Sequence, residues 1–354
     1  MTDYDRRSFL TNAIASLGLA VTGSGGLSAV FAQEGAPAKP HRIDVHHHFS
    51  PPAWVAVAQG RGTSAAPLQT ANTTWTPAQS IEDMDRGGVS AAVVSITNPG
   101  LWFGDKAVTN RLARTCNEYG AKLMQDHPTR FGLFAAMPLP DVDATLKEIE
   151  YAYDTLKADG IHLFTSYGDT WLGNPAYRPV MEELNRRKAV VHVHPTAANC
   201  CRNLDYAPDV LPSTMEYGTD TTRAIMGVTF SGDAARFRDI RFIWSHAGGT
   251  VPFLAGRIAG GVNRLKDREQ RLPNGFMYEL KKFYYDVAGA ANPGAIASLM
   301  KLVTSAQVLF GTDFPPGGTS LEVAKSLAQL GFSEMDLRAI DWENAVRLLP
   351  RFNA

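Results

Sequence analysis

The stretch from Ile43 to His48 reads IDVHHH, and FSPP follows it immediately. The apolar residues at its start predict a short strand, and the two prolines end that strand soon after its last histidine. Side chains alternate across a strand, so His46 and His48 share one face while His47 points to the opposite one. Two imidazoles at one strand end are a ready pair of ligands for zinc or a similar ion. We therefore interpret His47 as a packed residue and the other two as a candidate metal-binding pair.

Short apolar runs recur along the 354 residues, and longer polar or amphipathic stretches separate them. The predicted strands are Ile43–His48, Ala91–Thr97, Phe131–Met137, Ile161–Thr165, Ala189–His194, Arg241–His246, Phe283–Val287 and Gln307–Gly311. Helical apolar spacing occurs between them at Asn110–Asp126, Ala144–Ala158, Tyr177–Arg187 and Gly318–Leu330. Eight strands separated by helices favour a parallel TIM (β/α)8 barrel, and an open doubly wound sheet is the alternative.

Three other predicted strands also lead into a metal-capable side chain and then into a loop breaker. The fifth ends at His194 before a proline, the sixth ends at His246 before Ala-Gly-Gly, and the eighth runs into Asp313 before Phe-Pro-Pro. The carboxyl ends of barrel strands meet at one rim, where barrel enzymes build their sites. Strand position favours His194 over His192 as a ligand and leaves His192 as a buried, hydrogen-bonded residue. We expect these strand ends to converge on the first histidine pair.

Two long inserts follow the first and fifth strands, at Phe49–Gln79 and Pro195–Gly218. Loops at the carboxyl ends of barrel strands shape the pockets of such enzymes, so both inserts are interpreted as substrate-pocket loops. Asp44 lies deeper on the face of His46 and His48, and it is a candidate hydrogen-bond partner for a ligand imidazole.

The charge and cysteine content exclude several classes of function. The formal net charge is -1, from 34 basic and 35 acidic residues, and no dense cluster of Lys and Arg stands out. Nothing would draw the chain to nucleic acid, so we expect no nucleic-acid partner. Cys116 falls in a helical pattern, while Cys200 and Cys201 are adjacent, so the three cysteines predict neither a disulfide framework nor a thiolate metal site.

The N-terminal segment has the features of a targeting signal. Paired arginines at Arg6 and Arg7 precede Phe-Leu, a mildly apolar Gly- and Ala-rich stretch follows, and small residues flank a cleavage point near Ala32. The stretch is too rich in Gly, Ser and Thr for a transmembrane anchor, so no stable membrane insertion is expected. It resembles a twin-arginine export signal at residues 1–32, with a leader at 33–42 and the barrel at 43–354. Passage through the twin-arginine export machinery would place the mature protein in the periplasm or outside the cell.

Several motifs together resemble a known family. Asp44–Phe49, His194-Pro195, Ser245–Gly249 and Gly311–Pro315 are similar to motifs of the amidohydrolase-2 branch of the amidohydrolase superfamily, which includes α-amino-β-carboxymuconate-ε-semialdehyde decarboxylase. The resemblance runs from about Ile43 to Pro350. The central stretch is most similar to the 6-methylsalicylate decarboxylase-like subgroup, through Asn117-Glu118, His127-Pro128, Arg130–Gly132, Ala158–Gly160 and Asp220–Ala224.

The resemblance implies one divalent metal ion, usually zinc and in some members manganese, held by His46, His48, His194 and Asp313. It implies that His246 is the nearby acid/base group and not a ligand. It also implies that Arg257 binds the substrate carboxylate, sometimes in the site of a neighbouring subunit, and that the protein is a homodimer.

Such a site supports two reactions, and the motifs do not choose between them. One is non-oxidative decarboxylation of a small aromatic or unsaturated carboxylic acid such as a 2-hydroxybenzoate, with His246 or protonated Asp313 carrying the proton. The other is metal-dependent hydrolysis of a lactone, ester or amide. The subgroup resemblance favours the decarboxylase, while the predicted export tempers that preference. A third interpretation of the site is a non-enzymatic metal- or solute-binding protein.

Overall fold

The computed structural model describes residues 41–61, 68–196 and 210–353. These residues all belong to one compact unit, Lys39–Ala354. The predicted export signal at residues 1–32 lies outside the described residues, as does the predicted leader up to residue 40. None of the described helices is both long and apolar enough to cross a membrane.

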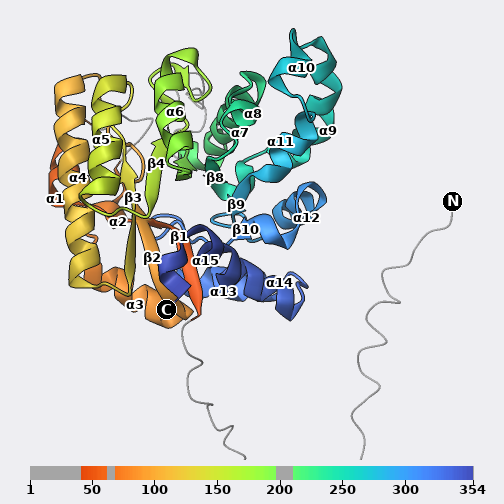
Figure 1. Ribbon diagram of the computed structural model, residues 1–354. Helices are drawn as coiled ribbons and strands as arrows, with labels where there is room; N and C mark the ends of the chain where they lie inside the picture. The colour runs from red at the N-terminus through yellow and green to blue at the C-terminus, as the bar shows by residue number, and fades with distance from the viewer. Residues whose placement is uncertain (1–40, 62–67, 197–209, 354) are drawn as a thin grey trace, which may run out of the picture. The chain divides into compact units, whose positions relative to one another are not determined.

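Eight parallel strands form one sheet in the order β1-β2-β3-β4-β7-β8-β9-β10 (Figure 1). The sheet closes on itself, because the Val45 amide of β1 donates to the Phe310 carbonyl just beyond β10, at 3.0 Å. This is the predicted TIM barrel, and the open sheet is excluded. The strands are β1 (Arg42–His48), β2 (Val89–Ser95), β3 (Phe131–Ala136), β4 (Gly160–Phe164), β7 (Val190–His194), β8 (Arg241–Trp244), β9 (Tyr284–Asp286) and β10 (Val308–Leu309), with a small separate hairpin of β5 (Ser166–Tyr167) and β6 (Thr170–Trp171).

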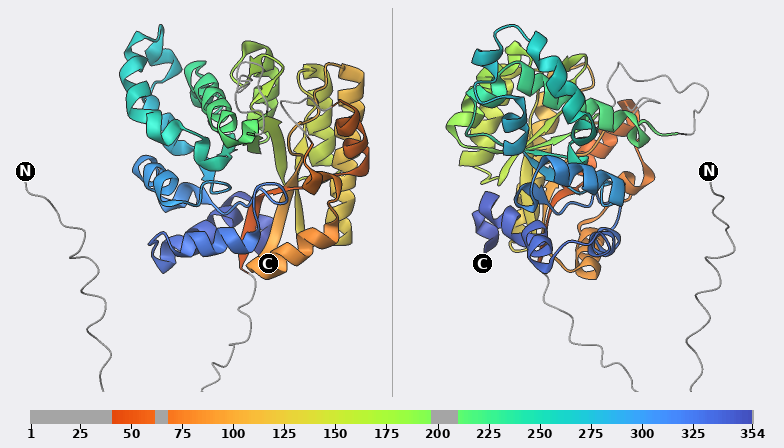
Figure 2. Two further views of the ribbon diagram at one scale, coloured as in Figure 1. Left: turned by 180° about the vertical axis from the view of Figure 1, so that it is seen from behind. Right: turned by 90° about the vertical axis from the view of Figure 1, so that its right-hand side faces the viewer.

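Helices surround the strands on all sides, as the two views of Figure 2 show. The longest, α4, begins where the Asp105 carboxylate accepts a hydrogen bond from the Val108 amide at 3.1 Å, and it ends just before His127-Pro128. The helices are α1 (Pro52–Arg61), α2 (Thr70–Thr73), α3 (Pro77–Gly87), α4 (Lys106–Asp126), α5 (Val142–Asp154), α6 (Arg178–Arg186), α7 (Glu216–Phe230), α8 (Asp233–Arg236), α9 (Val251–Gly261), α10 (Arg268–Arg271), α11 (Phe276–Lys282), α12 (Pro293–Leu302), α13 (Ser320–Ala328), α14 (Glu334–Arg338) and α15 (Asn344–Leu348).

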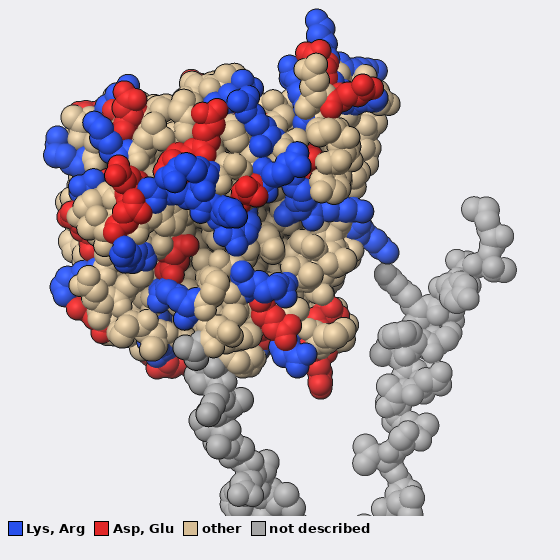
Figure 3. All heavy atoms as spheres, in the orientation of Figure 1, with Lys and Arg blue, Asp and Glu red and all other residues tan. Residues whose placement is uncertain are grey.

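Strand alternation separates the apolar core from the site. In β7, Val191 and Val193 belong to the main hydrophobic core. His194 projects from the opposite face of the strand into the site, and alternation puts His192 on the same face as His194. Burying such aliphatic side chains contributes about 1.5–3 kcal/mol each, so the core holds the strands firmly under the rim. On the outside, basic and acidic side chains are interspersed over most of the face shown in Figure 3.

The structure corrects three details of the sequence interpretation. The insert Phe49–Gln79 is not simply a loop: it contains α1, α2 and the start of α3, which Thr76 caps. The sixth strand stops at Trp244, so His246 lies in a 3-10 turn (His246–Gly248) beyond it. The eighth strand is only Val308–Leu309, and Asp313 therefore stands on the loop that follows.

Candidate metal centre

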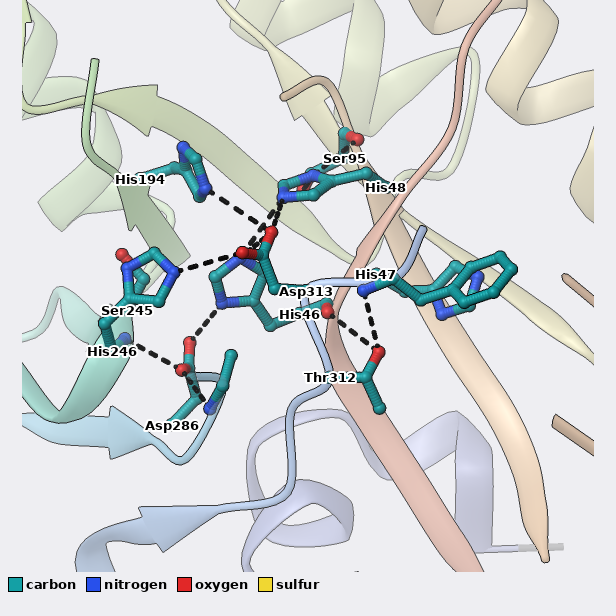
Figure 4. A network of polar contacts seen from close by, with 12 residues as sticks. His46, His47, His48, Ser95, His194, Ser245, His246, Asp286, Thr312 and Asp313 are labelled. Carbon is teal, nitrogen blue, oxygen red and sulfur yellow. Dashed lines mark hydrogen bonds and ion pairs between the residues drawn. The ribbon is translucent and has the colours of Figure 1, made fainter. Parts of the chain in front are cut away.

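Four side chains, from the ends of β1 and β7 and from the loop after β10, meet at the rim of the barrel (Figure 4). One ligand atom from each of His46, His48, His194 and Asp313 lies within 4.8 Å of the others. The Nε2 atoms of His46 and His48 are 3.2 Å apart. Asp313 Oδ1 is 2.8 Å from His48 Nε2 and 3.9 Å from His194 Nε2. The structure thus brings together the four residues that the family resemblance implies as ligands.

Each of the three imidazoles is oriented by a hydrogen bond at its other nitrogen. His48 Nδ1 faces the Ser95 carbonyl at 3.2 Å, and His194 Nδ1 faces the Pro195 carbonyl at 2.7 Å. His46 Nδ1 faces the Asp286 carboxylate at 2.9 Å. Because these acceptors take the proton on Nδ1, each of the three Nε2 atoms faces the same point and can offer its lone pair there when its ring is neutral.

The donor set fits a divalent metal ion. His194 Nε2 is enclosed and has no hydrogen-bond partner among the described residues, and leaving a buried polar atom unsatisfied costs about 1–3 kcal/mol. A cation at the shared point would satisfy this atom and the lone pairs of the other two imidazoles. Three imidazoles with one carboxylate are a ligand set for zinc and for similar divalent ions. We conclude that the rim carries a metal-binding site.

The electrostatics of the cluster agree with this fit. Burial lowers the pKa of His48 to about 4 and that of His194 to about 3, so both are neutral and can bind a cation at neutral pH. Burial also acts to lower the pKa of His46, but the Asp286 and Asp313 carboxylates raise it to about 10. Despite its burial, Asp313 has a pKa held well below its usual range by the surrounding imidazoles. At neutral pH His46 thus carries a proton that the two carboxylates stabilise, and a metal ion bound here would take the place of that proton on Nε2.

His246 stands beside the four residues on the open side of the cluster. Its Nε2 atom is 3.4 Å from Asp313 Oδ2, and 19% of its side chain is exposed. Its backbone has a φ of 54°, a left-handed conformation that is unfavourable for a residue with a side chain. The backbone amide of His246 donates to Asp286 Oδ1 at 3.0 Å. This location suits an acid/base group that works next to a metal.

Asp44 behaves differently from the sequence expectation. The pairing of β1 with β2 shifts register between Asp44 and His47, so simple alternation fails there. The Asp44 carboxylate contacts His47 Nδ1 at 3.0 Å and the Thr312 hydroxyl at 2.6 Å, not the imidazole of a ligand. His47 also contacts Ser80 of α3 at 2.8 Å and stacks on Phe314, so it is packed as predicted.

His192 lies one layer below His194, buried as predicted. Its Nδ1 is 3.2 Å from His162 Nδ1, and its Nε2 is 3.4 Å from Asp286 Oδ2. His162 and Asp286 received no role from the sequence. An acidic residue at the carboxyl end of an apolar strand was the available signal for Asp286, whereas nothing distinguished His162. His46, His192 and Asp286 form a second group that could hold an ion, but the 2.9 Å contact between Asp286 and His46 is an ordinary hydrogen bond.

A cavity of about 540 Å³ opens over the cluster. His194, His246 and Asp313 contribute to its lining, and both inserts supply other parts of it, as predicted. None of the described lining residues is Lys or Arg. The other lining residues are Gln69, Asn72, Thr97, Asn98, Leu211, Ser213, Thr214, Met215, Tyr217, Gly218, Gly249, Thr250, Gly289, Ala290, Ala295, Pro316 and Gly317.

Arg257 does not join this cavity within one chain. It lies on α9 with its side chain exposed, and it is absent from the described lining. Its role in binding a substrate carboxylate stays a prediction.

The sequence matches the family described as Amidohydrolase over residues 43–351. The chain belongs to this family. It is similar to the decarboxylase yanB of Aspergillus niger, with 38% identity over 326 residues that cover 88% of both chains. It is also similar to the 6-methylsalicylic acid decarboxylase of Penicillium expansum, with 36% identity over 318 residues, 88% of this chain and 96% of that enzyme.

A solved structure of an amidohydrolase II has the same fold, with a TM-score of 0.80 at 27% identity over 87% of this chain and 99% of that one. These similarities confirm the resemblance to the amidohydrolase-2 branch and to its 6-methylsalicylate decarboxylase-like subgroup. Both relatives are named as decarboxylases, so the hydrolase alternative gains no support over the main interpretation.

Proposed function

We propose that this amidohydrolase is a metal-dependent decarboxylase that removes CO₂ from a small 2-hydroxybenzoate such as 6-methylsalicylate. The observation that carries the proposal is His246 beside the four-residue cluster, at the floor of a cavity large enough for one aromatic ring. The similarity to 6-methylsalicylic acid decarboxylase supplies the substrate class.

The metal would be held by His46, His48, His194 and Asp313. Zinc is the ion we propose, with manganese as the alternative, because imidazoles suit zinc and carboxylates suit both. When bound, the ion would orient the oxygens of the substrate and offset the negative charge that develops on them.

His246 would supply the proton of the reaction. It donates to the ring carbon that bears the carboxylate, the bond from that carbon to the carboxylate breaks, its electron pair returns to the ring, and CO₂ leaves. Asp313 Oδ2, 3.4 Å from His246 Nε2, would stabilise the protonated imidazole before this transfer. The neutral His246 then regains a proton from solvent through the open cavity.

Side chains in the cavity wall would contact the substituents of the substrate ring. Tyr217 and Asn98 both line the cavity, and the Thr196 hydroxyl donates to Asn98 Oδ1 at 3.1 Å. These groups bind polar substituents, whereas Ala290, which also lines the cavity, would contact the apolar edge of the ring.

We propose that the protein acts as a homodimer in which Arg257 of one copy approaches the cavity of the other. The support is the family resemblance, together with the exposure of Arg257 on α9 outside its own cavity. Sedimentation should give twice the chain mass. An Arg257→Ala variant should raise KM for the carboxylic acid more than it lowers kcat, and an unchanged KM would reject this role.

We also propose export through the twin-arginine route to the periplasm or beyond, on the basis of Arg6 and Arg7. The Arg6→Lys, Arg7→Lys double variant should accumulate in the cytoplasm. An unchanged amount of exported protein would overturn this assignment.

The function is tested with purified metal-loaded protein and a panel of 2-hydroxybenzoates, beside a panel of aryl esters and lactones. We expect CO₂ and the matching phenol from the first panel, and a loss of at least about 100-fold in His246→Ala, the usual scale of a general acid. His127→Ala, which changes a histidine near the amino end of β3, is the matched control and should keep full activity. Ester or lactone turnover without CO₂ would assign a hydrolase instead. Metal binding without any turnover would support a non-enzymatic metal- or solute-binding protein.

A further inference from the structure

Asp286 is a buried carboxylate that contacts both halves of the candidate site. It is the last residue of β9 and has no solvent-exposed surface. Its Oδ2 atom accepts from His46 Nδ1 at 2.9 Å, and its Oδ1 atom accepts from the backbone amide of His246 at 3.0 Å. Oδ1 also accepts from the Ala288 amide at 3.1 Å, which fixes the plane of the carboxylate. One rigid group thus joins a candidate ligand to the acid/base residue (Figure 4).

The neighbouring loop is shaped to allow this contact. A Cβ atom on Gly311 would lie 2.9 Å from the Cβ of His46 and 3.1 Å from the Cβ of Asp286. Contacts this short would push the two side chains out of place, so a glycine is needed where the chain passes them. Gly311 therefore leaves the room that the contact between His46 and Asp286 needs.

The backbone of His246 needs such support. His246 and Ala247 both have left-handed φ values, 54° and 56°, a conformation that is unfavourable for residues with a Cβ atom. A hydrogen bond from a backbone amide to a carboxylate is charge-assisted and stronger than a neutral one. Losing it would let the turn relax and move the imidazole away from Asp313.

We propose that Asp286 is a positioning residue that couples metal retention to the placement of His246. Through Oδ2 it fixes the ring of His46 so that Nε2 faces the metal point, and through Oδ1 it holds the turn that carries the acid/base group. Its effect on turnover rests on the proposed function, whereas its effect on metal retention does not.

The test compares Asp286→Asn with Asp233→Asn. Asp233 is a comparably buried carboxylate that pairs with Arg178, and the structure gives it no contact with the site. Metal dissociation constants come from competition with a chromophoric chelator, and geometry comes from the visible spectrum of the Co²⁺-substituted protein. Asp286→Asn should weaken metal binding about 10- to 100-fold and change the Co²⁺ bands. Asp233→Asn should lower only the melting temperature.

Turnover measurements test the second part of the proposal, the placement of His246 by Asp286. At saturating metal, Asp286→Asn should still lower kcat at least about tenfold with a smaller change in KM, because His246 is misplaced. Metal affinity within twofold of the parent, or full kcat at saturating metal, would overturn the coupling. If the parent protein decarboxylates nothing while Asp286→Asn still weakens metal binding, the proposed function fails and the effect of Asp286 on metal retention stands.

A measurement on the unchanged protein covers the case in which Asp286→Asn does not fold. With ¹⁵N-labelled histidine, the Nδ1–H proton of His46 should give a downfield signal that exchanges slowly, and His46→Gln should remove it. Absence of that signal in the parent protein would contradict the hydrogen bond to Asp286. Metal analysis gives a further check: one ion per chain is expected, and two would assign His46, His192 and Asp286 to a second metal site instead.

Discussion

The choice between the two histidines of β7 gives the sharpest test of the metal site. His194 offers a ligand atom to the four-residue cluster, whereas His192 lies below it and is turned toward His162 and Asp286. Structural zinc sites bind with about 10–16 kcal/mol, so an equal share for one of four ligands is about 2.5–4 kcal/mol. His194→Ala should therefore weaken metal binding about 100- to 1,000-fold.

His192→Ala should have a different signature. It removes a buried ring that stacks on Phe134, with centroids 5.6 Å apart, and leaves a cavity. We expect a loss of about 2–4 kcal/mol in unfolding free energy, with metal affinity reduced less than tenfold. Metal affinity can be measured by chelator competition and the unfolding free energy by urea unfolding, on the same preparations. If His192→Ala loses the metal and His194→Ala keeps it, the assignment of ligands on β7 is wrong.

Three further perturbations test the surroundings of the site. Removal of the metal should lower the melting temperature by about 5 °C relative to protein in free metal at 100 times the dissociation constant, because metal at that concentration stabilises the fold by about 2.7 kcal/mol. An unchanged melting temperature would argue against a resident ion. Gly317→Ala places a Cβ 2.3 Å from Asp313 Oδ2 and should weaken metal binding at least about tenfold, whereas Gly60→Ala, in open space, should not; equal affinities would refute the steric argument. Thr312→Val removes the 2.6 Å contact to Asp44 and should cost about 1–3 kcal/mol in urea unfolding, and no change would show that the contact is dispensable.

The barrel and the candidate ligands could be predicted because they follow from local rules. Alternation along β1 places His46 and His48 on one face, and loop breakers after His194 and Asp313 place those side chains at the rim. All eight predicted strands occur, with ends that shift by up to two residues. The insert after β1 contains helices that were missed, although Pro52, at the first position of α1, is a signal for a helix start.

The features of the site that the sequence did not predict depend on contacts between segments that are distant in the chain. Asp44 turns to His47 because a register shift interrupts the alternation, and no sequence pattern reveals such a shift. Asp286 is a single acidic residue in an apolar strand, and its importance appears only when β1 and the turn after β8 are placed on either side of it. The left-handed backbone of His246 likewise follows from packing beyond the strand end and not from its own residue type.

The reaction itself is tested most directly by running it in D₂O with 6-methylsalicylate and metal-loaded protein. We expect equal amounts of CO₂ and 3-methylphenol, with a single deuterium on the ring carbon that carried the carboxylate, and a rate at least about 100-fold lower in His246→Ala. No CO₂ from any 2-hydroxybenzoate, or equal turnover by His246→Ala and the parent protein, would contradict decarboxylation by proton delivery from His246.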